Sequence, residues 1–203
     1  MASLSQGWGL GRFFVPRRDK IIKRLQETLD PERFEHSLRV EKIALQLAAR
    51  YRVNKQQASL AALLHDCARR YDRRGLLREA KRLGLKIRPL DRAEPKLLHG
   101  ELGVRLARRE FRVGSRPVLE AIRCHTTGKP GMAKLAKIIY LADHVEEGRD
   151  HAAAGRIRKL AFRQLDRAIA ESAGAQLEYL LRRGQPIDPA TLETRNSYLK
   201  KRR

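Results

Sequence analysis

The feature that most limits how this chain can fold is an apolar run that ends in a histidine and an aspartate. Residues 61–64 read Ala-Ala-Leu-Leu, and His65 and Asp66 follow directly. A carboxylate at the inner end of a buried segment is unfavourable unless it is paired or bound to a metal. The run therefore predicts a helix whose end carries a polar pair into the core, and the partners of that pair must come from elsewhere in the chain.

The rest of the sequence favours one all-α domain. A chain of 203 residues is long enough to bury a substantial core. Only 5% of the residues are aromatic, Ala, Leu and Arg are abundant, and no run of alternating β-branched residues is present. We expect the domain to cover residues 17–199, between a flexible basic N-terminal arm (1–16) and a basic C-terminal tail (200–203).

Charge and cysteine content limit the partners and the compartment. The 45 Lys and Arg against 23 Asp and Glu give a net charge of +22, which attracts polyanions such as nucleotides, RNA or acidic membranes. No apolar stretch reaches about 18 residues, so no membrane span is expected. Two cysteines are too few for a disulfide framework, which suits a reducing cytoplasm. We interpret both, Cys67 and Cys124, as small core residues.

Apolar periodicity and end signals predict a series of helices. Asp30, followed by Pro31, and Asn54 are the expected N-caps. The expected helices cover residues 17–29, 31 to about 51, 55–69, 76–83, 99 to about 111, 117–125, 132–146 and 156–183, with a loop over 87–96 and a polar tail after 184.

Four histidines and a second aspartate accompany these helices. His36 lies on the apolar stripe of its helix, His99 opens a helix, His125 ends one, and Asp143 stands where an apolar residue is expected. Taken alone, His36 could equally be a core histidine with a hydrogen-bond partner, whereas an unpaired carboxylate at Asp143 would be destabilising unless a metal binds it. Together with His65 and Asp66 they could hold two adjacent iron, manganese or zinc ions, with Asp66 as a bridge.

The order of these residues resembles the HD-domain metal-dependent phosphohydrolases. Downstream, residues 125–132 read HTTGKPGM and residues 139–143 read IYLAD, a block that resembles the bacterial YqeK family of symmetrical bis(5′-nucleosyl)-tetraphosphatases. The resemblance covers about residues 17–199, including Arg33-Phe34-Glu35-His36-Ser37 and Leu98-His99-Gly100.

The resemblance implies an HD-domain helical bundle with a two-metal centre in its core, in which iron is the expected metal and manganese or another transition metal the alternative. One metal would be held by His36, His65, Asp66 and Asp143, and the other by Asp66, His99 and His125. The implied reaction is hydrolysis of diadenosine tetraphosphate to two ADP, with Asp66, His99 and His125 as the catalytic residues.

Five further residues are expected to contact the substrate. Lys129, Arg69 and Arg149 are the expected phosphate contacts, and Thr126 and Gly128 lie in the loop that would line the nucleotide pocket. Family members often have Lys where Arg69 stands and Arg where Lys129 stands, and both exchanges keep a cation. The alternative interpretation of the three cations is that they are solvated surface charges. The alternative for the loop is that its Gly and Pro residues only end the preceding helix.

Two other functions stay open at this point. One keeps the metals but changes the substrate to another nucleotide, because a fold alone does not fix a substrate. The other is a basic RNA-binding protein with a degenerate HD core, which would bind RNA through its basic termini. A homodimer is left open, His144 and His151 are expected to be exposed and inert, and Tyr140 either orients a ligand or packs.

Overall fold

The computed structural model describes residues 17–149 and 152–199, and all regular structure in these ranges is helical. The predicted arm (1–16) and tail (200–203) lie outside the described residues, as does His151. The elements are α1 (Arg18–Thr28), α2 (Pro31–Tyr51), α3 (Lys55–Leu64), the 3₁₀ turn η1 (Cys67–Arg70), α4 (Arg73–Arg82), α5 (Pro89–Ala93), the 3₁₀ turn η2 (Pro95–Leu98), α6 (His99–Phe111), α7 (Arg116–Cys124), α8 (Lys134–Val145), α9 (Ala152–Ala161), α10 (Leu165–Arg182) and α11 (Pro189–Tyr198).

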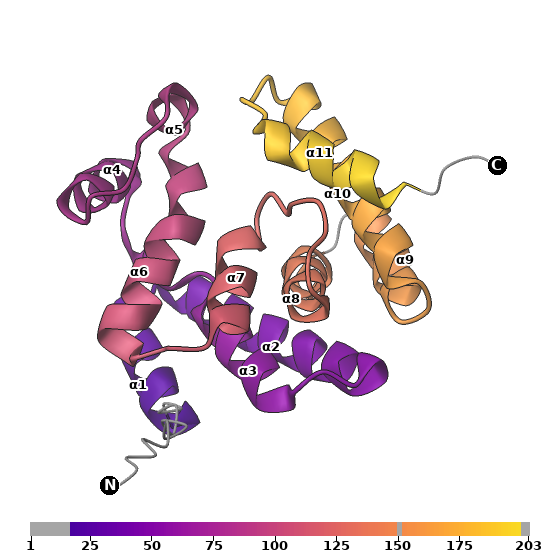
Figure 1. Ribbon diagram of the computed structural model, residues 1–203, viewed down its shortest axis with the longest axis horizontal. Helices are drawn as coiled ribbons and strands as arrows, with labels where there is room; N and C mark the ends of the chain where they lie inside the picture. Colours follow the sequence, from indigo (N-terminus) through magenta and orange to yellow (C-terminus); the bar gives the residue numbers. More distant parts are fainter. Residues whose placement is uncertain (1–16, 150–151, 200–203) are drawn as a thin grey trace, which may run out of the picture.

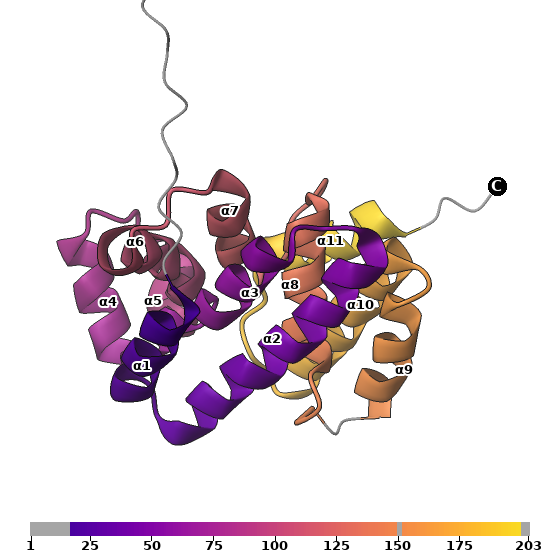
Figure 2. The same cartoon turned by 90° about the horizontal axis from the view of Figure 1, so that it is seen from below.

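Four helices form the centre of the bundle. The 21-residue helix α2 runs diagonally along the molecule and packs against α3 and α8 (Figure 2). Helix α7 packs against both α3 and α8. On one side of this centre lie α4, α5 and α6, and on the other lie α9, α10 and α11 (Figure 1). The all-α prediction is confirmed, and five of the six predicted ligands lie on or just after these four helices.

The predicted caps explain where the central helices begin. The Asp30 side chain accepts a hydrogen bond from the Arg33 amide at 2.9 Å, and the Asn54 side chain accepts one from the Gln57 amide at 3.0 Å. Such caps satisfy amides that have no partner in the first turn. A third cap was not predicted: Asp72 accepts from the Gly75 amide, so α4 begins three residues before the expected start.

The helix predicted over residues 55–69 is wrong in its second part. α3 ends at Leu64, and Asp66 leaves the helical path with φ −105° and ψ 15° before η1 begins. Neighbouring side chains on a continuous helix do not face each other. Because the path changes here, His65 Nε2 and Asp66 Oδ2 come within 3.7 Å.

The single long helix predicted over residues 156–183 is also wrong, because α9 and α10 are separate. The end of α2 takes up the carbonyls at the break: the Tyr51 hydroxyl donates to the Ala161 carbonyl at 2.6 Å, and Arg50 Nε donates to the next carbonyl at 3.0 Å. The apolar pattern continues through the turn, so the sequence alone does not reveal it.

The predicted loop over 87–96 and the predicted polar tail after 184 both contain helices. Helix α5 is too short for its periodicity to be read, and it is started by Asp91, which accepts from the Arg88 amide at 2.8 Å. Helix α11 is capped by Asp188, which accepts from the Ala190 amide at 3.0 Å. Its buried side chains are threonines, so it has no apolar stripe.

Helix α11 packs along α10 and reaches back over the loop between α7 and α8 (Figure 1). Within the described ranges, no helix combines the length and the apolar character that crossing a membrane requires.

Candidate metal centre

The structure brings all six predicted ligands into one place. They come from different elements, and each stands within a central helix or at a helix end. His36 lies on α2, His65 and Asp66 between α3 and η1, His99 at the start of α6, His125 at the end of α7 and Asp143 on α8. All are buried except Asp143, which is partly buried.

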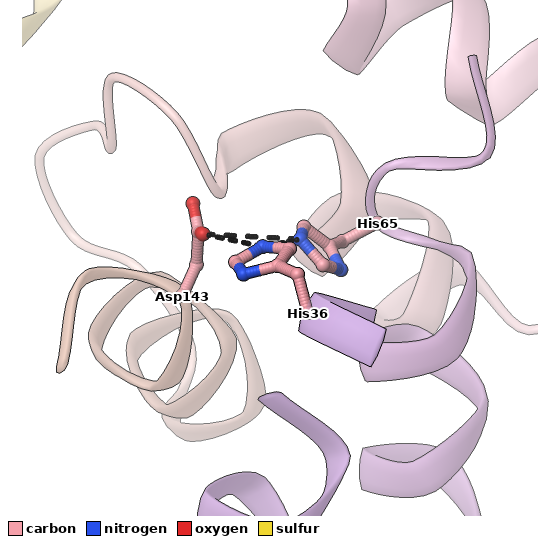
Figure 3. Close-up of side chains that lie close together, drawn as sticks. All are labelled: His36, His65 and Asp143. Atoms are coloured by element: carbon pink, nitrogen blue, oxygen red, sulfur yellow. Dashed lines mark hydrogen bonds and ion pairs between the residues drawn. The ribbon is translucent and has the colours of Figure 1, made fainter. Parts of the chain in front are cut away.

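The first cluster joins α2, α3 and α8. His36 Nε2 lies 3.2 Å from His65 Nε2 and 3.1 Å from Asp143 Oδ1. His65 Nε2 lies 3.9 Å from the same Asp143 oxygen. Figure 3 shows the two imidazole rings and the carboxylate facing one another. Three ligand atoms from three helices therefore surround one small volume.

The second cluster lies on the other side of Asp66. His99 Nε2 and His125 Nε2 are 2.8 Å apart, and Asp66 Oδ1 lies 3.3 Å and 3.4 Å from them. The other carboxylate oxygen, Oδ2, lies 3.7 Å from His65 Nε2 and 3.9 Å from His36 Nε2. Asp66 therefore presents one oxygen to each cluster, which is the arrangement of a bridging ligand.

The hydrogen bond that each ring makes through Nδ1 fixes the tautomer of all four imidazoles. Three rings donate Nδ1–H to the backbone carbonyl three residues earlier, at 2.6 Å for His65 and 2.7 Å for His125, and His99 does the same to Lys96. His36 donates Nδ1–H to the Glu146 carboxylate at 3.3 Å. A neutral imidazole that donates from Nδ1 has an acceptor lone pair at Nε2. Every Nε2 lone pair is thus directed into the centre.

This donor set fits a pair of divalent transition metals. Two acceptor nitrogens that face each other at 2.8 Å or 3.2 Å repel unless a cation lies between them. Nitrogen ligands about 2.1 Å from one metal and at right angles to each other lie about 3.0 Å apart. Imidazole and carboxylate ligands, with hydrogen-bonded second nitrogens, suit iron, manganese and zinc.

Burial and charge keep most of these groups in the protonation state that a metal requires. Burial lowers the pKa of His65 to about 4 and that of His99 to about 3, so both rings stay neutral. Burial alone would raise the pKa of Asp66 and of Asp143, but the surrounding imidazoles hold both well below the usual range. His125 differs: burial lowers its pKa, but the negative charge of the Asp66 carboxylate, 3.4 Å from Nε2, outweighs burial and raises it.

Three arginines surround the centre. Arg149, a predicted phosphate contact, donates from Nη2 to Asp143 Oδ1 at 3.1 Å. Arg69 lies close enough to His99 for its charge to lower the pKa of that ring. Arg33 Nη1 donates to Asp66 Oδ2 at 2.9 Å. Sequence reasoning gave Arg33 no role, because its partner Asp66 lies 33 residues away in the chain.

The loop after His125 places its predicted residues differently. The Thr126 hydroxyl lies 3.0 Å from His99 Nε2 and 3.1 Å from His125 Nε2, so it belongs to the second cluster. Lys129 pairs with Glu120 on α7. Gly128 was predicted to line the nucleotide pocket. It has φ +66°, and it packs against α11.

Glu146 was also missed by sequence reasoning. It is buried, and besides His36 it accepts hydrogen bonds from Arg39 Nε and the Gly148 amide, both at 2.6 Å. Hydrogen bonds of this kind orient a metal-binding imidazole. The sequence showed Glu146 only as the end of a predicted helix, because its partner His36 lies 110 residues away.

Other predictions for residues near the centre have mixed outcomes. His144 is wrong as an exposed residue: it is partly buried, and its Nδ1 donates to the Tyr140 carbonyl at 2.6 Å. Tyr140 is fully buried and stacks on His144 with ring centroids 4.4 Å apart, so it packs. Cys67 and Cys124 are buried and unpaired, as predicted.

A helical bundle with histidines and aspartates in this order defines the class of HD-domain proteins. The HD domain family matches residues 33–148, a span that holds every one of the six ligands.

Relatives identify the family more closely. The chain is 36% identical over 185 residues to a symmetrical bis(5′-nucleosyl)-tetraphosphatase of Halalkalibacterium halodurans, covering 90% of this chain and 97% of the relative. It is 32% identical over 179 residues to that of Bacillus subtilis, covering 88% and 96%. The chain belongs to this family of symmetrical bis(5′-nucleosyl)-tetraphosphatases, so the family resemblance read from residues 125–143 is confirmed.

A solved structure has the same fold. A Clostridium acetobutylicum protein, described as a predicted HD superfamily hydrolase involved in NAD metabolism, superposes with a TM-score of 0.86 at 34% identity. The match covers 90% of this chain and 96% of that chain. The HD-domain helical fold predicted from the sequence is therefore confirmed.

Proposed function

We propose that this protein hydrolyses diadenosine tetraphosphate symmetrically to two ADP, at a centre that holds two divalent metals. The observation that carries the proposal is the convergence of four Nε2 lone pairs and two carboxylates around a bridging Asp66. Its substrate class rests on family membership across about nine-tenths of the chain.

The ligands divide into the two observed clusters. One metal would be held by His36, His65, Asp143 and Asp66 Oδ2, and the other by Asp66 Oδ1, His99 and His125. When bound, such a pair supplies an activated water near neutral pH and neutralises phosphate charge. We propose iron as the native metal and manganese as the alternative, because this nitrogen and oxygen set accepts both.

The chain's own residues would position the substrate. Arg149 lies against Asp143 of the first cluster, and the charge of Arg69 acts on His99 of the second. A symmetrical tetraphosphate carries equal negative charge on either side of its central bridging oxygen, so cations near both clusters favour cleavage of a P–O bond at that oxygen. Asp66, His99 and His125 are the proposed catalytic residues, and the Thr126 hydroxyl would donate to a phosphoryl oxygen at the second cluster.

The proposed substrate contacts are unequally supported. Arg149 and Thr126 contact ligand side chains, and Arg69 acts on His99 through its charge. Lys129 must leave Glu120 to reach a phosphate. Gly128 contributes chiefly by allowing the loop to turn beneath α11.

No observation favours the other partners. RNA binding through the basic termini concerns residues 1–16 and 200–203, which the structure does not describe. Nothing in the described part of the chain argues for a homodimer. A cytoplasmic location remains a proposal based on the two unpaired cysteines.

The function is tested with protein purified without oxygen. Its metal content is measured, and the products of diadenosine tetraphosphate are separated by chromatography beside a panel of mononucleotides. ADP as the only nucleotide product, loss of activity on chelation and its return with iron or manganese are expected. Products of AMP and ATP, or faster hydrolysis of a mononucleotide, would contradict the assignment. Asp66→Asn should be inactive, whereas Arg108→Ala, at an exposed position on α6, should match the wild type.

A further inference from the structure

Arg33 occupies a distinctive position at the edge of the metal centre. It lies on α2, one turn before His36, and its Nη1 donates to Asp66 Oδ2 at 2.9 Å. Its side chain is 27% exposed, whereas that of Asp66 is 5% exposed. The guanidinium therefore reaches from the bridging carboxylate towards solvent, where a ligand can arrive.

The local charge shows why this arginine needs a further partner. Asp66 and Asp143 bring two negative charges, which two divalent cations would already exceed. Arg33 and Arg149 each lie against one of these carboxylates, and Arg69 lies beside His99. Their combined charge makes the surroundings strongly positive, and a polyanion from solution is the natural complement.

The donors of Arg33 are largely available. A guanidinium carries five N–H groups in a planar fork and grips a phosphate bidentately. In the described part of the chain, Asp66 is the side chain seen to hydrogen-bond the Arg33 guanidinium, and it takes one of these groups. Arg39 on the same helix is different, because its Nε binds the buried Glu146 at 2.6 Å.

We propose that Arg33 binds a phosphate of the substrate beside Asp66 and the first cluster. The proposal rests on the proposed function and adds a substrate contact to it. A phosphate bound by Arg33 then lies next to Asp66. A purely structural alternative is that Arg33 only orients Asp66.

Binding of the product ADP tests this directly. Titration calorimetry is carried out on metal-loaded wild type, Arg33→Ala, Arg33→Lys and the exposed control Arg108→Ala, with metal content and circular dichroism measured on each. Loss of a charged hydrogen bond to phosphate weakens binding by about 10- to 100-fold. We expect that loss of ADP affinity in Arg33→Ala at unchanged metal content, a smaller loss in Arg33→Lys and none in the control.

Kinetics separate the two roles of Arg33. For diadenosine tetraphosphate, Arg33→Ala should raise KM about 10- to 100-fold. Bis(p-nitrophenyl) phosphate, which has a single phosphate, should be affected much less. Equal losses with both substrates, or a loss of metal content with unchanged ADP affinity after reloading, would overturn the proposal in favour of a role in orienting Asp66.

The calorimetric result is independent of the reaction. If the wild type does not cleave diadenosine tetraphosphate, the proposed function fails, yet ADP affinity still decides the role of Arg33. If ADP binds Arg33→Ala as well as it binds the wild type, or binds neither protein, the inference about Arg33 fails.

Discussion

The contact between Gly128 and α11 yields a prediction whose size follows from the structure. Gly128 has φ +66°, and a Cβ added there would lie 2.6 Å from Thr194 Cγ2 and 2.7 Å from Thr194 Oγ1. Thr194 is fully buried, and its hydroxyl donates to the Thr127 carbonyl at 3.0 Å. Helix α11 therefore fixes the loop that begins at His125.

The substitution Gly128→Ala combines two unfavourable effects. A left-handed backbone costs a non-glycine residue about 1–2 kcal/mol, and overpacking costs about 1–3 kcal/mol. We therefore expect the free energy of unfolding to fall by about 2–5 kcal/mol. Gly131→Ala is the matched control: Gly131 has the same φ of +66° but nothing within 4 Å of its added Cβ. It should lose only the backbone part, about 1–2 kcal/mol.

A double-mutant cycle isolates the contact. Thr194→Ala alone loses a buried hydrogen bond, which costs about 1–3 kcal/mol. It also removes the two atoms that a Cβ added at Gly128 would meet first, so the Cβ of residue 194, at 3.2 Å, becomes the nearest atom to that added Cβ. The double variant should therefore be more stable than the sum of the single effects predicts, by about 1–3 kcal/mol.

Urea unfolding of the four Gly128 and Thr194 proteins and the Gly131 control measures these differences. Equal losses in Gly128→Ala and Gly131→Ala, together with additivity within about 0.5 kcal/mol, would refute the packing of α11 on this loop.

Three further predictions concern buried polar groups. Glu146→Ala should lower metal affinity about 10- to 100-fold in equilibrium dialysis. Glu147→Ala is the control, because the exposed Glu147 side chain pairs with Lys42, and it should not change the affinity. Equal metal affinities of the two variants would exclude the orienting role of Glu146. Burial raises the pKa of Cys67 and of Cys124 to about 12, so a thiol reagent at pH 8 should modify both only after unfolding. Burial alone would raise the pKa of Asp91, but hydrogen bonds from Arg88 hold it below the usual value. Its contribution to stability is present above about pH 4 and is lost as the pH falls through its folded-state pKa, so Asp91→Asn should show a weaker fall in stability over that range; an unchanged pH profile would contradict this.

Much of the candidate metal centre could be proposed from the sequence because ligand chemistry is local. His65 and Asp66 stand at the end of an apolar run, and Asp143 interrupts an apolar stripe, so each is a polar group where burial demands a partner. Side-chain caps such as Asp30 and Asn54 act within three residues, so the starts of α2 and α3 could also be read directly.

The sequence could not show which residues support these ligands. Glu146 acquires its role only because α8 ends beside His36, and Arg33 acquires its role only because α2 passes the end of α3. Polar side chains at helix ends or on partly exposed faces are common, so neither carries a signal of its own.

The C-terminal half shows the same limit. The apolar pattern runs through the turn between α9 and α10, and the break is satisfied by Tyr51, 110 residues earlier in the chain. Helix α11 buries Thr191 and Thr194 and therefore has no apolar stripe to read. The sequence by itself determined the helical class, the caps of α2 and α3 and the residues proposed as ligands, because these depend on neighbours within a turn or on side-chain chemistry. Only the tertiary structure decided how the ligands pair, what orients them and what holds the loop after His125, because those contacts join segments that are distant in the chain.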